Sequence, residues 1–93
     1  MTSKICTGLE ELAKMAARSS TDAAAAAKAI QAARAAVADG LKTASGPARQ
    51  ALEKLDGELG IWQSKLSVIL AEPVGRQGMV KHAAYWVEQL KRL

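Results

Sequence analysis

The sequence contains no phenylalanine, one cysteine and one histidine in 93 residues. A single cysteine forms no disulfide within the chain, and Cys6 with His82 supplies too few soft ligands for a zinc site. The glycine loops that bind phosphate and the nucleophile motif G-x-S-x-G are also missing. We therefore expect no metal, no cofactor and no catalytic residue, and predict that the protein is not an enzyme.

Long hydrophobic runs are missing as well. No uncharged stretch approaches the roughly 18 residues of a membrane span, and the N-terminus lacks the apolar segment of a signal peptide. No segment alternates apolar and polar residues as a half-buried strand does. These absences favour a cytoplasmic, all-helical protein that makes no contact with a membrane.

Alanine dominates what is present. Nearly half of the residues are apolar, yet the only aromatic ones are Trp62, Tyr85 and Trp86. Because alanine buries little area, the hydrophobic contribution of each residue is modest. Contact with a partner would add burial that this chain cannot easily supply alone.

The segment 47–71 is predicted to be one uninterrupted helix, roughly 37 Å long, and the central element of the fold. Pro47 suits a first helical turn, and Glu72 precedes Pro73, which ends the helix. Apolar residues recur every three or four positions along one face. They are Ala48, Leu52, Leu55, Leu59, Trp62, Leu66 and Ile69.

A second face of the same segment carries only small residues, again at helical spacing. They are Gly57, Gly60, Ser64, Ser67 and Ala71. One interpretation is a solvated face. The interpretation that we prefer is a helix-packing surface, against which the alanine-rich second helix lies closely, so that the segment is buried on more than one side.

Three further helices complete the prediction. The first begins at Thr7, where Thr7 and Glu10 fit a capping box, and ends at 19–21. The second runs from Asp22 to Leu41 or Ala44, with Asp22 at the positive end of the helix dipole. The last runs over 79–93 and follows a loop at 74–78. The expected fold is a single all-α domain over 1–93, a small antiparallel bundle of about four helices.

The net charge of +4 is concentrated near the C-terminus, where residues 73–93 carry four cations against Glu88. An exposed tyrosine among cations is typical of an interaction surface, and the candidate partner-binding residues are Arg76, Lys81, Tyr85 and Arg92. The alternative is an ordinary solvated face with a Glu88–Arg92 pair.

The predicted function is therefore a protein–protein interaction module, such as a small adaptor, regulator or inhibitor. Its partner is another protein or a second copy of this chain. The alternative is a small basic nucleic-acid-binding protein that uses the C-terminal helix, in which cations neutralise phosphates.

Overall fold

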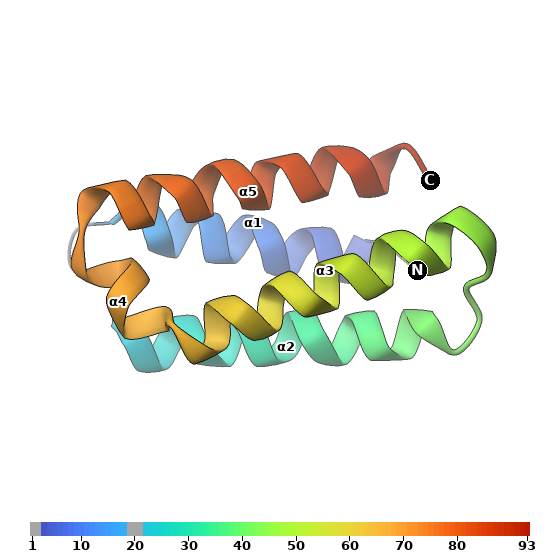
Figure 1. The fold of residues 1–93 in the computed structure, drawn as a ribbon, viewed down its shortest axis with the longest axis horizontal. Helices are drawn as coiled ribbons and strands as arrows, with labels where there is room; N and C mark the ends of the chain where they lie inside the picture. The colour runs from blue at the N-terminus through green and yellow to red at the C-terminus, as the bar shows by residue number, and fades with distance from the viewer. Residues whose placement is uncertain (1–2, 19–21) are drawn as a thin grey trace.

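Five helices make up the computed structural model, which describes residues 3–18 and 22–93. They are α1 (Ser3–Ala17), α2 (Ala23–Leu41), α3 (Gly46–Ser64), α4 (Leu66–Ala71) and α5 (Pro73–Lys91). The long helices lie side by side with alternating directions, and α4 crosses one end of the bundle between α3 and α5 (Figure 1). The described residues include no strand. The predicted antiparallel helical bundle is confirmed.

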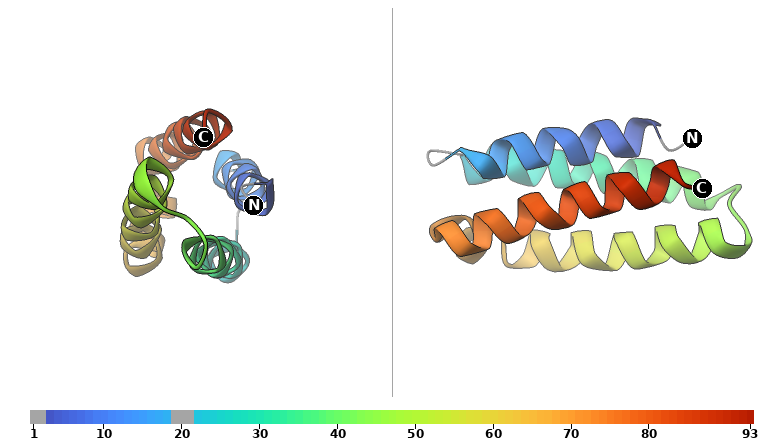
Figure 2. Two further views of the ribbon diagram at one scale, coloured as in Figure 1. Left: turned by 90° about the vertical axis from the view of Figure 1, so that its right-hand side faces the viewer. Right: turned by 90° about the horizontal axis from the view of Figure 1, so that it is seen from above.

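Viewed end-on, the long helices form a ring in the order α1, α2, α3 and α5 (Figure 2). The backbones of α1 and α5, of α1 and α2, and of α2 and α3 approach closely, whereas those of α3 and α5 hardly come within 8 Å of one another. α1 and α2 come close at Gly8 and Ala33, where a Cβ on Gly8 would lie in ordinary van der Waals contact with Cβ of Ala33, at 3.5 Å. The spacing between the backbones of neighbouring helices therefore differs around the ring.

The core is apolar throughout the part of the chain that the structure describes. The large side chains of α3 point into it, and those buried are Leu52, Leu55, Leu59 and Trp62. Small residues fill much of the space on the other helices, and those buried include Ala16, Ala26, Ala33, Gly40 and Ala83. The apolar seam predicted for 47–71 is therefore the contribution of α3 and α4 to the core.

Two helix starts test the predicted caps. Asp22 lies at the N-terminus of α2 as expected, and there it is the cap residue, because its Oδ1 accepts a hydrogen bond of 3.0 Å from the amide of Ala24. The capping box at Thr7 is wrong, since α1 begins at Ser3 and Thr7 Oγ1 donates to Ser3 O at 2.9 Å inside the helix. The extra turn places Ile5 in the core. The capping residues from which the helix start was predicted do not reflect this burial. The predicted end of the first helix at 19–21 lies outside the described residues.

The segment 47–71 is helical but is interrupted at Lys65, whose φ of −114° and ψ of 17° separate α3 from α4. Hydrogen bonds continue on both sides, from the Lys65 amide to Ile61 O and from Ile69 N to Lys65 O, each 3.0 Å long. Ser64 Oγ also donates to Ile61 O, at 3.0 Å, a competing bond that bends helices. The prediction of an uninterrupted helix is corrected at this bend, which turns α4 across the bundle end.

The segment is also less enclosed than predicted. Ile61 is 57 % exposed and Val68 is 72 % exposed, so the outer side of α3 and α4 faces away from the bundle. α3 therefore occupies one position in the ring and is buried on one side, which corrects the expectation of a central helix with several covered faces.

The predicted loop at 74–78 is wrong, because α5 begins at Pro73 and includes Gly75 and Gly78. Glu72 is extended, as the residue before a proline prefers, and Pro73 occupies the first turn. A Cβ on Gly75 would lie 2.3 Å from Ile69 O, so glycine at this position allows α5 to start directly against the end of α4.

We predict opposite effects for alanine at the two glycines of α5. Gly75→Ala forces the Ile69 carbonyl away and should lower the free energy of unfolding by about 1–3 kcal/mol. Gly78→Ala is the matched control, because nothing lies within 4 Å of its added Cβ and helix propensity should raise stability by up to about 1 kcal/mol. Urea unfolding measures both, and equal effects would contradict the close approach.

Candidate functional site

Tyr85 is the most exposed aromatic side chain of the described residues, and it stands near the middle of α5. It is 55 % exposed. Lys81 and Arg92 are also exposed and fall within roughly 40° of Tyr85 around the helix. Arg92 Nη2 pairs with Glu88 Oε1 at 3.5 Å, so the predicted i,i+4 pair is present. Three of the four candidate partner-binding residues therefore share one side of α5.

Arg76 is separate from this group. It lies roughly 180° from Tyr85 around α5, and its Nη1 donates a 3.0 Å hydrogen bond to Leu70 O at the end of α4. This bond satisfies a carbonyl that α4 leaves unpaired at its C-terminus. The structure thus gives Arg76 a role at the α4–α5 corner.

The ring of Tyr85 is held by its neighbour Trp86. The two ring centroids are 5.5 Å apart with an interplanar angle of 77°, an edge-to-face arrangement. Trp86 is itself buried, and its Nε1 donates a 2.7 Å hydrogen bond to Glu58 Oε2 on α3. Tyr85 therefore presents an exposed ring on a fixed support.

Glu58 joins α3 to α5 with both of its oxygens. Oε1 lies 2.7 Å from His82 Nδ1, and Oε2 accepts from Trp86. A carboxylate only accepts hydrogen bonds, so Nδ1 of His82 carries the hydrogen. These bonds span the one pair of neighbouring long helices whose backbones stay apart. We call Glu58, His82 and Trp86 the Glu58 clamp.

The sequence reasoning missed Glu58 and considered His82 only as a possible zinc ligand. Two signals were present. Glu58 flanks the buried seam of α3 between Leu55 and Trp62, and His82 and Trp86 are four residues apart on one side of α5. No sequence pattern indicated that Glu58 would lie against His82 and Trp86.

Two hollows flank Tyr85 between α3 and α5. The first has a volume of about 380 Å³ and is lined by Glu58, Lys81, His82 and Tyr85. The second has a volume of about 200 Å³, and its lining includes Gln50, Lys54, Tyr85, Gln89 and Leu93. We call the two hollows with Tyr85 between them the α3–α5 groove.

The small face of 57–71 makes almost no contact within the described chain. Gly57, Ser64, Ser67 and Ala71 are exposed. Gly60 alone is covered, by the guanidinium of Arg34, whose Nη1 lies 3.4 Å from the position of an added Cβ. The predicted packing of the second helix along this face is therefore limited to one side chain, and a role toward a partner stays a prediction.

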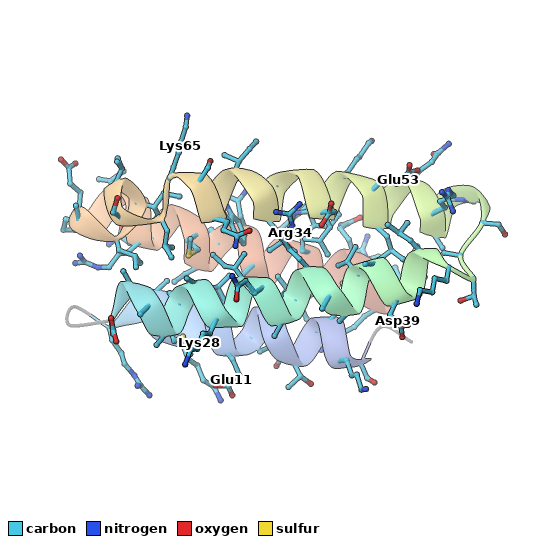
Figure 3. The ribbon with its side chains drawn as sticks, turned by 90° about the horizontal axis from the view of Figure 1, so that it is seen from below. Glu11, Lys28, Arg34, Asp39, Glu53 and Lys65 are labelled. Atoms are coloured by element: carbon cyan, nitrogen blue, oxygen red, sulfur yellow. The ribbon has the colours of Figure 1, made fainter. Side chains whose placement is uncertain are left out.

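Arg34 links α2 to α3 beside that glycine (Figure 3). Its Nε and Nη2 donate to the two oxygens of Asp56 at 3.0 and 3.4 Å, and Nη1 donates to Gln63 Oε1 at 3.0 Å. The hydrogen bond and the charge of Asp56 raise the pKa of Arg34. This bidentate pair is a structural contact between helices.

Cys6 lies in the core rather than in a reactive site. Burial raises the pKa of its thiol, Glu10 raises it further, and Lys91 lowers it. His82 Nδ1 bonds to Glu58 Oε1, and within the described residues no hydrogen bond joins His82 to Cys6. The contribution of the thiol to the free energy of unfolding is present below its unfolded pKa and is lost as the pH rises through the folded value.

Over residues 3–18 and 22–93, no three histidine, cysteine or carboxylate side chains gather in a way that would hold a metal ion. None of the helices in these ranges is long and apolar enough to cross a membrane. The chain matches no protein-family model, no curated protein and no solved structure. Function is therefore inferred from the residues of this chain alone.

We predict that Glu58→Gln destabilises the bundle by about 1–2 kcal/mol. The amide nitrogen of glutamine cannot accept, so one of the donors, Trp86 Nε1 or His82 Nδ1, loses its partner. Urea unfolding measures the loss, and the indole proton resonance of Trp86 should shift.

Glu53→Gln is the control for this change, because Glu53 lies on the same helix and makes an exposed 3.8 Å pair with Arg49. It should alter stability by less than about 0.5 kcal/mol. Equal stability of the two variants would show that the clamp contributes nothing.

We predict that Cys6 of the folded protein reacts at least about 100-fold more slowly with a disulfide reagent than Cys6 of the urea-unfolded chain at the same pH, because reaction requires opening of the core. Absorbance of the released thiolate measures both rates. Rates within about tenfold of each other would contradict the buried position.

Proposed function

We propose that this chain is a protein–protein interaction module without enzymatic activity, which binds another protein through Tyr85 and the α3–α5 groove. The observation that supports this most is the exposed Tyr85 ring, fixed against Trp86 and through it to Glu58. Tyrosine, tryptophan and arginine are the residues that most often dominate binding energies at interfaces. A ring held in place before binding loses little conformational entropy on association.

The chemistry around Tyr85 favours binding over catalysis. Both oxygens of Glu58 already accept hydrogen bonds, and His82 uses its Nδ1 in one of them. A general base must reach a substrate proton, and this carboxylate is engaged within the protein. The side-chain polar groups that line the hollows and remain available belong to Lys54, Lys81, Gln50 and Gln89, with His82 Nε2 and the Tyr85 hydroxyl.

The nucleic-acid alternative has weaker support. Among the cations of α5, Arg76 is bonded to Leu70 O and Arg92 is paired with Glu88. Lys91 is six residues from Tyr85, which places it roughly 120° from Tyr85 around α5. Lys81 and Arg92 share the side of Tyr85, but Arg92 is paired with Glu88, so this side offers a phosphate backbone one unpaired cation of α5.

Site-specific photocross-linking tests the proposal. A benzophenone amino acid in place of Lys81, beside Tyr85, should capture a partner protein in cells that make this chain. The same residue in place of Lys28 is the control, because Lys28 is exposed on α2, diagonally opposite α5. A cross-linked second copy would identify the chain itself as the partner, and capture of RNA or DNA in place of protein would refute the proposal.

We predict that Tyr85→Ala weakens binding to the captured partner by about 30-fold or more, the effect of a residue that dominates an interface. Calorimetric titration with the purified partner measures the affinity. Ile61→Ala removes a similarly exposed apolar side chain from the outer side of α3 and should leave the affinity unchanged. An unchanged affinity for folded Tyr85→Ala would contradict the role of Tyr85.

A further inference from the structure

We infer that the α3–α5 groove receives an acidic amphipathic helix of the partner protein, which places apolar side chains on either side of Tyr85 and carboxylates at Lys54 and Lys81. This inference rests on the proposed function and specifies the chemistry of the partner. Two properties of the groove support it, namely its shape and its charge.

The shape of the groove fits a short helix. The two hollows share Tyr85 and extend along α5 from Lys81 to Leu93. Twelve residues of helix correspond to roughly 18 Å, so a partner helix of about three turns matches this length. Both hollows open to solvent between α3 and α5, so one partner helix can contact the two hollows and the Tyr85 ring between them.

The charge of the groove is positive. Lys54 lies in one hollow and Lys81 in the other, and neither has an ion pair within the described ranges. The carboxylate that lines the groove, Glu58, already accepts from Trp86 and His82. On the flanking surfaces, Glu53 is paired with Arg49 and Glu88 with Arg92. Two unpaired lysines therefore face an incoming segment, and complementary carboxylates would fix its register and raise its association rate.

The opposite side of α5 is less suited to the same partner. A hollow between α1 and α5 is lined by Ala13, Ala83, Ala84 and Val87, with Glu10 and Lys14 at its rim. No aromatic side chain projects into it, and the opposite charges of its rim give no preference for an acidic ligand. Among the hollows in the described residues, those of the α3–α5 groove combine an exposed aromatic ring with two lysines that have no ion pair.

Selection from a displayed library of random helical peptides, with the full-length chain as bait, tests this inference. The enriched peptides should be acidic, carry apolar residues every three or four positions, and gain helicity on binding as measured by circular dichroism. Each peptide should shift the Trp86 indole resonance, because Trp86 lines the groove.

Charge reversal provides the decisive measurement. Lys54→Glu and Lys81→Glu should each weaken the selected peptides by about tenfold or more, whereas Lys28→Glu on α2 should leave affinity unchanged. These lysines are exposed, so the variants should fold, which thermal unfolding checks.

The outcomes separate the two proposals. Peptides that require Tyr85 but are neutral, basic or extended would overturn the acidic helix and keep the interaction surface. Peptides that bind without dependence on Tyr85, Lys54 or Lys81, or no enriched peptide at all, would overturn the inferred groove occupant, whereas the proposed function fails only if Tyr85 is dispensable for the cross-linked partner.

Discussion

The distance between neighbouring helices depends on the size of the side chains between them, and this dependence shapes the whole bundle. Each of α1, α2 and α5 buries alanine beside its larger core residues, and the backbone of α1 approaches both of its neighbours closely. α3 buries leucines and Trp62, and α5 turns Trp86 toward it, so these two backbones remain apart. An interior packed to crystal-like density cannot leave the difference empty. The wide side of the ring is therefore where large side chains and polar contacts meet.

The Glu58 clamp and the α3–α5 groove both follow from this asymmetry. A carboxylate at the edge of the wide interface reaches two donors on the facing helix, and it satisfies the indole of Trp86, which would otherwise be buried without a partner. The same separation leaves hollows beside Tyr85, since no backbone fills them. The residues that join α3 to α5 therefore also support the surface that we propose for a partner, since the Tyr85 ring packs edge-to-face against Trp86.

The corner between α4 and α5 depends on three local contacts. The bend at Lys65 carries α4 across the end of the bundle, and Gly75 lets α5 start against it. Arg76 then bonds Leu70 O, so one of the cations that make the C-terminal quarter basic stabilises a helix end. A cation count along the sequence overstates the charge available to a partner.

Local patterns in the sequence determined the helical class, the buried seam of 47–71, the start of α2 near Asp22, the break at Glu72 and the exposed Tyr85 with its Glu88–Arg92 pair. Each of these depends on residues within a turn or two of one another. Tertiary structure alone decided the early start of α1, the bend at Lys65, the continuation of α5 through 74–78 and the exposure of the small face. It also decided the clamp, whose partners are 24 and 28 residues apart in the chain. Such contacts depend on the distance between packed helices. The combined volume of side chains from separate helices sets that distance, and no single stretch of the sequence contains all of those side chains.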